Sequence, residues 1–367
     1  MTDTPSPAPP PRSRFAAMAR RVRDAVKPPD TNFKTVNLAL QGGGAYGAFT
    51  WGVLDGLLDD ERLDFEAISG TSAGAMNAVV LADGLMRDGV AGARTRLEAF
   101  WRGVSREGSG AGATADVMQS ILGFWHMPGF SPFSYFERLA NLVSPYGTNP
   151  LNINPLRTLL EELVDFDKVR ANDALKLFVS ATNVRNGKVK VFSGHEITAD
   201  AILASACLPF LFQAVEIGGE AYWDGGYMGN PALFPFFTET RSADILLVQV
   251  NPVRREEEPK TAREIMERAS EITFNASLLR EFRAIDFVNR LMDESRLDPK
   301  RYKRNRLHRI DATHALAQFA TTSKFDTSWR FFEELHEAGR KAAKDWLHRH
   351  YDDIGVKATL DLRAEFM

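Results

Sequence analysis

The stretch that decides the fold is FEAISGTSAGAMNAVVLADGL, residues 65–85. Its first five residues are typical of a short strand, and the segment from Ala73 to Leu85 is apolar and helix-prone. Ser72 therefore lies where a strand gives way to a helix, inside the G-x-S-x-G pattern of a nucleophile elbow. The flanking Gly70 and Gly74 leave room for such a turn. Because G-x-S-x-G also occurs by chance in ordinary turns, the surrounding sequence has to show whether Ser72 is a nucleophile.

A glycine-rich loop lies upstream of this elbow. The sequence GGGAYG ends at Gly47 and follows an apolar, strand-like run. The N–H groups of Gly42, Gly43 and Gly44 are suited to hold the oxyanion that forms when a serine attacks a carbonyl group. The same glycines also fit the dinucleotide fingerprint G-x-G-x-x-G, but that fold needs an acidic residue at the end of its second strand. Here the second strand ends in SGTS, so the two motifs favour hydrolysis of an acyl ester over dinucleotide binding.

A serine nucleophile needs a base, and the sequence offers two kinds. The most constrained acid is Asp224, in the segment AYWDGG, although an aspartate before two glycines also forms plain β-turns. Histidine is the commonest catalytic base, and an α/β-hydrolase triad would combine Ser72 and Asp224 with His308 or His314. The alternating sequence RLHRI around His308 predicts a strand with that histidine on its polar face.

Four segments in order carry a family resemblance: GGGAYG, GTSAG, the sequence SACLPF that begins at Ser205, and WDGG followed by Asn230-Pro231. Over residues 35–239 the chain resembles the bacterial patatin-like phospholipases. The resemblance implies a Ser–Asp dyad in place of a triad, without metal or cofactor. Ser72 would be the nucleophile, Asp224 the base, and the backbone of residues 42–44 the oxyanion hole. The supporting glycines of the motifs are Gly47, Gly70, Gly74, Gly225 and Gly226.

The alternation of strands and helices after residue 35 predicts a three-layer α/β/α sandwich with a mostly parallel central sheet. The resemblance implies a lipid carboxylic ester as substrate, with phospholipids as the leading class. A protein that keeps the fold and binds lipid without turnover is the remaining alternative. We divide the chain into a basic, proline-rich tail (1–34), a patatin-like catalytic domain (35–239) and a mainly helical C-terminal extension packed on it (240–367).

Composition limits the other function classes. The chain has 367 residues and a net charge of −3, which gives no reason to expect a nucleic-acid partner. Its single cysteine, Cys207, excludes an internal disulfide and suits a reducing, cytoplasmic compartment. That cysteine lies in the apolar run SACLPFLF, so we expect a buried, unreactive thiol. No apolar run approaches the ~18 residues of a membrane span.

The N-terminal tail and the chain after residue 175 add further expectations. Residues 13–27 have arginines opposite a small apolar face, which is typical of peripheral contact with an anionic membrane or, alternatively, of a flexible tail or a helix docked on the body of the protein. Residues 176–182 and 188–192 predict a hairpin, and ILLVQV at 245–250 predicts a strand buried on both faces. Helical periodicity over 262–292 and 328–350 predicts two long helices that cover the sheet or form a homodimer surface.

Overall fold

The computed structural model describes residues 33–105, 144–209, 211–317 and 327–366. Its strands are β1 (Lys34–Leu40), β2 (Leu63–Gly70), β3 (Lys176–Asn183), β4 (Val189–Ser193), β5 (Val215–Ile217), β6 (Glu220–Asp224), β7 (Asp244–Gln249) and β8 (Arg306–Asp311). Its helices are α2 (Gly47–Asp60), α3 (Ala73–Val104), α6 (Pro145–Thr148), α7 (Pro155–Leu163), α8 (Phe166–Arg170), α9 (Ala199–Ser205), α10 (Pro235–Glu239), α11 (Ala262–Asp293), α12 (Thr313–Ala317), α13 (Trp329–His350) and α14 (Leu362–Phe366). Short 3-10 turns include η1 (Gly44–Tyr46) and η3 (Gly225–Tyr227). The predicted basic tail lies outside the described residues, apart from its last two.

The strands form one mixed sheet in the order β5-β6-β3-β2-β1-β7-β8, with β4 paired to β3 off this path. The pairs β1–β2, β1–β7, β2–β3 and β7–β8 are parallel. The pairs of β3 with β4 and β6, and of β5 with β6, are antiparallel. The predicted hairpin of β3 and β4 and the predicted buried strand β7 are both confirmed.

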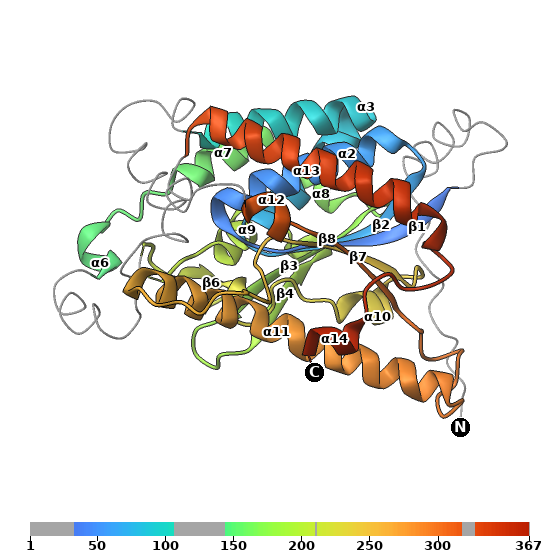
Figure 1. The fold of residues 1–367 in the computed structure, drawn as a ribbon. Helices are drawn as coiled ribbons and strands as arrows, with labels where there is room; N and C mark the ends of the chain where they lie inside the picture. Colours follow the sequence, from blue (N-terminus) through green and yellow to red (C-terminus); the bar gives the residue numbers. More distant parts are fainter. Residues whose placement is uncertain (1–32, 106–143, 210, 318–326, 367) are drawn as a thin grey trace, which may run out of the picture.

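The sheet is covered by helices on both faces, because its central strands alternate apolar side chains between two cores. Leu38 and Leu40 of β1 pack with α2, α3 and α13, whereas Ala39 packs with the core under α11. In β7, Leu246 joins the first core and Leu247 the second. Figure 1 shows α2, α3 and α13 above the sheet and α11 with α14 below it. The predicted three-layer α/β/α sandwich is confirmed.

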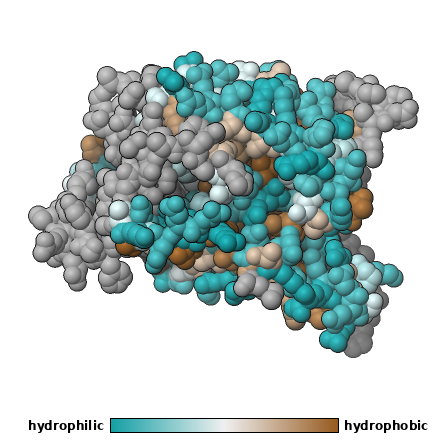
Figure 2. Space-filling view, in the orientation of Figure 1, coloured by the Kyte–Doolittle hydropathy of each residue, from teal (hydrophilic) through white to brown (hydrophobic). Residues whose placement is uncertain are grey.

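The two long C-terminal helices cover the sheet. Helix α13 lies so close to α2 that a Cβ on Gly52 would come within 1.9 Å of the His336 carbonyl oxygen. The outward face of α13 is mainly hydrophilic in the view of Figure 2. In α11, however, the apolar Ile265 and Ile272 are about half exposed, although periodicity would place them inward. The reason is that this part of α11 buries polar residues such as Asn275 against the loops at the end of the sheet.

Residues beyond 239 contribute strands as well as helices. Strand β7 pairs directly with β1 in the middle of the sheet, and β8 extends the sheet beyond β7. The sheet is therefore completed by the C-terminal part of the chain, while the division into three domains stays a prediction. Within the described segments, no helix combines the length and the apolar character needed to span a bilayer.

Candidate active site

Ser72 lies in the turn between β2 and α3, with backbone angles φ 53° and ψ −122°. A positive φ is rare for a residue with a Cβ, so this conformation is strained and must be held by its surroundings. The Ser72 N–H donates to Ser205 Oγ at 2.9 Å, and the Thr71 hydroxyl donates to the Gly229 carbonyl at 2.6 Å. The sharp strand-to-helix turn has the conformation of a nucleophile elbow.

The glycines of the elbow are required by close packing of backbone on backbone. A Cβ on Gly74 would lie 2.2 Å from the Leu40 carbonyl oxygen, and one on Gly70 would lie 2.6 Å from the Gly74 carbonyl oxygen. A Cβ on Gly47 would come within 2.7 Å of Ala73 Cβ, at the start of α3. Contacts this short do not occur, so any larger residue would displace the turn that carries Ser72.

Strand β3 brings Asp224 to the end of β2. Val179 of β3 pairs with Gly70 of β2 and, on its other side, with β4. Two residues along, Ala181 pairs with Asp224 of β6 and again with β4. Because β4 occupies one side of β3 over residues 178–182, β2 and β6 share the other side and meet end to end. Asp224, the last residue of β6, thus lies beside the turn that follows β2.

The Asp224 carboxylate is held on one oxygen only. Oδ1 accepts the Gly226 N–H at 2.6 Å, while Oδ2 is buried and has no hydrogen-bond partner among the described residues. The backbone is fixed through the Asp224 N–H to the Cys207 carbonyl at 2.8 Å and through the Thr182 hydroxyl to the Asp224 carbonyl at 2.8 Å. The loop is tight, since a Cβ on Gly225 would come within 2.1 Å of a carbonyl oxygen of β3, and one on Gly226 within 2.1 Å of the ring of a phenylalanine of α11.

Burial makes Asp224 an unusually strong base. The side chain is fully buried, and this raises its pKa from 3.8 to about 7. The Gly226 N–H and the Ser72 hydroxyl both lower the pKa, but burial outweighs them. Ser72 is therefore close enough to stabilise the charged carboxylate, although it does not reach Oδ2 with the geometry of a hydrogen bond.

The glycine loop lies directly against Ser72. A Cβ on Gly42 would be 3.0 Å from Ser72 Cβ. The Gly42 N–H is already occupied, since it donates to Asn230 Oδ1 at 2.7 Å. The N–H groups of Gly43 and Gly44 make no hydrogen bond within the described residues. Of the three expected oxyanion donors, two are therefore available to a substrate and Gly42 is not.

Helix α11 supports both loops with buried polar side chains. Asn275 accepts from Gln41 Nε2 at 2.9 Å, just before the glycine loop. Ser277 Oγ accepts the N–H of Asn230 at 3.2 Å, and Glu281 accepts the N–H of Leu233 through both carboxylate oxygens. Burial raises the pKa of Glu281 to about 7, because it outweighs the hydrogen bonds from this loop, which lower the pKa.

Sequence reasoning missed several of these supporting residues. Ser205 belonged to a recognised motif, but no pattern predicted its contact with the Ser72 N–H. Asn275 lies 234 residues from its partner Gln41, and Asn251 lies 209 residues from its partner Gly42. No local sequence signal marks these α11 residues, because the helix carries many charged side chains and only the fold shows which of its polar residues are buried.

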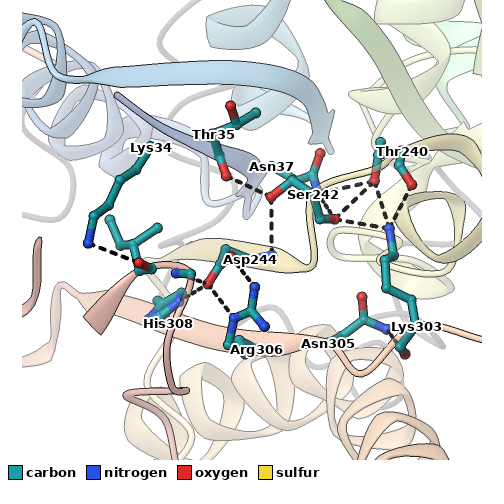
Figure 3. Close-up of polar contacts among 12 residues, drawn as sticks. Lys34, Thr35, Asn37, Thr240, Ser242, Asp244, Lys303, Asn305, Arg306 and His308 are labelled. Carbon is teal, nitrogen blue, oxygen red and sulfur yellow. Dashed lines mark hydrogen bonds and ion pairs between the residues drawn. The ribbon is translucent and has the colours of Figure 1, made fainter. Parts of the chain in front are cut away.

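The histidine of the alternative triad lies elsewhere. His308 is fully buried, not on a polar face as predicted, because it joins a buried polar cluster at the other end of the sheet. Its Nε2 lies 3.0 Å from Asp244 Oδ1, and its Nδ1 lies 3.1 Å from the Thr359 hydroxyl. Figure 3 shows this ring directed at Asp244, beside Arg306. Asp244 begins β7, whereas Ser72 follows the end of the parallel strand β2, so the structure does not bring His308 to Ser72. The side chain of His314 is outside the described part.

Cys207 is buried, as expected. Its thiol contacts the Gln213 carbonyl oxygen at 3.2 Å, and burial together with the Asp224 charge raises its pKa to about 12. The neighbouring cavity of about 40 Å³ is lined by Cys207, Leu203 and Gln213 among others, and includes neither Ser72 nor Asp224. Within the described residues, no three His, Cys, Asp or Glu side chains lie close enough together to hold a metal ion.

The sequence model of the patatin-like phospholipases matches residues 38–237, which is more than half of the chain and includes the glycine loop, the elbow and the aspartate loop. The chain belongs to the patatin-like phospholipase family. It is therefore an enzyme of the lipid acyl hydrolase class, and the dinucleotide interpretation of the glycine loop is excluded.

Comparisons of the chain with solved structures and with curated proteins carry less weight than the family model. The chain is similar to VipD from Legionella pneumophila, with 18% identity and a TM-score of 0.43, covering 86% of this chain and 67% of that one. It is similar to the type III effector ExoU, with 13% identity and a TM-score of 0.33, covering 86% of this chain and 53% of that one. The structure of ExoU from Pseudomonas aeruginosa in complex with SpcU gives 15% identity, a TM-score of 0.30, and coverage of 86% and 54%. A search of curated proteins finds no match. Because these TM-scores are below 0.5, family membership rests on the sequence model.

Proposed function

We propose that this patatin-like enzyme hydrolyses lipid carboxylic esters through a dyad of Ser72 and Asp224. The observation that carries the proposal is Asp224 itself, a buried carboxylate with one partnerless oxygen and a pKa of about 7, beside a serine in a strained elbow. A base works best when its pKa is near the working pH, because it is then both deprotonated and strong. Catalytic hydrogen bonds in ligand-free structures are often long and shorten when substrate binds.

The reaction would proceed in two steps. Asp224 accepts the proton of the Ser72 hydroxyl as Oγ attacks the ester carbonyl carbon, and returns it to the leaving alcohol as the acyl–oxygen bond breaks. Asp224 then accepts a proton from water as the water oxygen attacks the acyl-enzyme, and returns it to Ser72 Oγ as the acyl–Oγ bond breaks, which releases the carboxylic acid and free Ser72. The oxyanion of each tetrahedral intermediate is held by the N–H groups of Gly43 and Gly44, with help from the N-terminus of α3.

The Gly42 N–H has a different part in this proposal. Because it donates to Asn230, it supports the loop and does not contact the oxyanion. Gly47, Gly70, Gly74, Gly225 and Gly226 likewise support the site through the close approach that their lack of a Cβ permits. The mechanism requires no metal or cofactor.

Covalent capture of the nucleophile tests the dyad. An alkyl fluorophosphonate should add one phosphonyl group to the wild type and none to Ser72→Ala, as measured by intact mass. Asp224→Asn should be labelled far more slowly than the wild type. Asp345→Asn, at an exposed position of α13, is the matched control and should be labelled at the wild-type rate. Equal labelling of Ser72→Ala and wild type would refute the assignment.

The leading substrate class is phospholipid, which family membership supports. Hydrolysis should be measured on phosphatidylcholine and phosphatidylglycerol vesicles, a lysophospholipid, a triacylglycerol and p-nitrophenyl butyrate. Release of fatty acid from a phospholipid or lysophospholipid that is lost in Ser72→Ala would support this class. Turnover of short soluble esters alone would contradict it.

We also propose that the enzyme acts in the cytoplasm, in peripheral contact with a membrane through its basic tail. Deleting residues 1–30 should reduce co-sedimentation with anionic vesicles at low salt and leave hydrolysis of a soluble ester unchanged, because each basic residue near such a surface contributes about 1 kcal/mol. Equal sedimentation of both forms across a salt series would contradict the membrane role. A homodimer stays a prediction, to be tested by light scattering.

A further inference from the structure

The backbone of Gly42 is held on both sides by asparagine side chains. Its N–H donates to Asn230 Oδ1 at 2.7 Å, and its carbonyl oxygen accepts from Asn251 Nδ2 at 2.7 Å. Asn230 follows the aspartate loop and Asn251 follows β7, so two distant parts of the chain converge on this one residue. Both hydrogen bonds are short for N–H···O contacts, which favours a fixed orientation of the two peptide groups.

The carbonyl that Asn251 holds belongs to the same peptide group as the Gly43 N–H. A trans peptide is planar, and its C=O and N–H point in opposite directions. Fixing the Gly42 carbonyl therefore fixes the direction of the Gly43 N–H, which makes no hydrogen bond of its own within the described residues. The next residue is confined as well, since a Cβ on Gly43 would lie 2.6 Å from Val250 Cγ2.

Asn251 is itself held through its backbone, which leaves its side chain free for this one task. Its N–H donates to Gln41 Oε1 at 2.9 Å, and its carbonyl accepts from Gln249 Nε2 at 2.9 Å. Truncating the side chain removes the hydrogen bond to Gly42 without touching these backbone contacts. The side chain is only partly buried, so the cavity that truncation leaves is small.

We propose that Asn251 is a positioning residue, which aims the Gly43 N–H at the oxyanion by holding the Gly42 carbonyl. This inference rests on the proposed function, because it presumes that Gly43 is an oxyanion donor to the ester bound at Ser72. It adds a residue outside the matched family region, which ends at residue 237. Asn251 acts through the glycine loop and does not contact the reacting atoms.

The test compares Asn251→Ala and Asn251→Asp with the wild type on p-nitrophenyl butyrate. Losing an oxyanion donor costs about 10²–10³-fold in kcat, and a misdirected donor should cost about 10- to 100-fold. KM should stay within about twofold, since the ground-state ester gains little from this contact. The rate of labelling by an alkyl fluorophosphonate should fall in parallel, because its phosphoryl oxygen occupies the oxyanion position.

A matched control is available at the far end of α11. Asn289 holds the N–H and the carbonyl of Asn305, at 3.0 and 2.9 Å, and is also partly buried. Asn289→Ala should lose the same kind of hydrogen bond and keep the wild-type kcat. Thermal unfolding of all variants shows which of them are folded, and Asn251→Asp keeps the shape of the side chain in case Asn251→Ala does not fold.

Two results would overturn the inference. One is wild-type kcat in both folded Asn251 variants, and the other is a rise in KM with kcat unchanged, which would make Asn251 a ground-state binding residue. Failure of the proposed function gives a different pattern, because Ser72→Ala would then keep the wild-type activity. If Ser72→Ala is inactive while Asn251 variants are fully active, the dyad stands and the positioning role fails.

Discussion

Asp224 and Asp244 are both buried aspartates at strand ends, and they lie at opposite ends of the sheet. Asp244 is enclosed by donors: two nitrogens of Arg306 at 2.9 and 2.7 Å, His308 at 3.0 Å and the Gly355 N–H at 3.0 Å. Figure 3 shows this convergence on one carboxylate. Asp224 has one hydrogen bond, from the Gly226 N–H, and its second oxygen is unpartnered within the described residues.

Their pKa values move in opposite directions for this reason. Burial raises the pKa of both carboxylates, but at Asp244 the hydrogen bonds from His308 and Arg306 outweigh it and hold the pKa well below the ordinary range. At Asp224 burial dominates and the pKa rises to about 7. A buried charge that is fully paired joins parts of the fold, whereas one left underpaired costs stability and gains proton affinity. The comparison assigns Asp244 a structural role and supports the proposal that Asp224 is the catalytic base.

The largest expected effect is on kcat, which should fall when Asp224 is substituted and not when Asp244 is. Asp224→Asn and Ser72→Ala should each lower kcat roughly 10³-fold or more, and the double variant should be scarcely worse, because members of a dyad act as a unit. Asp244→Asn, measured on the folded fraction, should keep kcat within a few-fold of the wild type. Steady-state rates on a soluble ester decide this, and substantial activity in Asp224→Asn would remove Asp224 from the dyad.

The same substitution should change stability with opposite signs at the two sites. At pH 7, Asp244→Asn should lose roughly 3 kcal/mol of unfolding free energy, because it leaves Arg306 without its buried partner. Asp224→Asn should gain stability, on the order of 1–3 kcal/mol, because an underpaired buried charge disappears. Urea unfolding followed by tryptophan fluorescence measures both. A loss of stability in Asp224→Asn would contradict the view that the underpaired Asp224 carboxylate destabilises the folded protein.

The sign of the pH dependence follows from the two shifts. A folded pKa above the unfolded one means that the native state binds the extra proton, so the contribution of Asp224 to stability falls as pH rises from about 4 to 7. The gain in unfolding free energy of Asp224→Asn over the wild type should therefore be small near pH 4 and complete above pH 7. Asp244 behaves in the opposite way, because its stabilisation is present above the unfolded pKa and is lost as pH falls through its depressed folded pKa.

Activity should show the same titration. Because the base must be deprotonated, kcat/KM on a soluble ester should fall about tenfold for each pH unit below ~7. Cys207 and Tyr227 do not interfere, since the pKa of each is raised above its ordinary value, that of the thiol to about 12. Burial raises the pKa of Glu281 to about 7 as well, so Glu281→Gln is the control. In this variant the pH below which kcat/KM falls should be unchanged. If kcat/KM falls only near pH 4, Asp224 is not the base, or its carboxylate is not desolvated in the working enzyme.

Much of the site was accessible from local sequence. Ser72 was predicted at a strand-to-helix turn and lies there, and the aspartate loop was predicted after a strand and lies at the end of β6. Such features are local, because the tight turns need glycine at fixed offsets from the functional residue. The three-layer sandwich followed from the alternation of strands and helices, and the structure confirms it.

What could not be predicted depends on contacts between distant residues. The Gly42 N–H carries the same sequence signal as that of Gly43, and only the fold shows that Asn230 occupies it, 188 residues away. His308 was expected on a polar face, because alternation cannot reveal that Asp244, 64 residues upstream, provides a buried polar partner. Ile265 and Ile272 fit a helical period, yet α11 turns polar residues toward the loops. In each case a hydrogen bond between residues distant in the sequence decides what the local pattern cannot show.

The smallest expected effect on catalysis is that of the histidines. His308→Gln and His314→Gln should each leave kcat within about tenfold of the wild type, or ~1.4 kcal/mol of barrier, because neither takes part in the proposed dyad. His308→Gln should still lose about 1–2 kcal/mol of unfolding free energy, since a buried hydrogen bond to Asp244 is weakened. Measured together, kcat and the unfolding free energy show whether His308 acts with Asp244 or with Asp224. A loss of stability without loss of kcat places His308 with Asp244 as a structural pair, whereas a 10³-fold loss of kcat in a folded variant would favour a triad and make Asp224 the partner of a histidine.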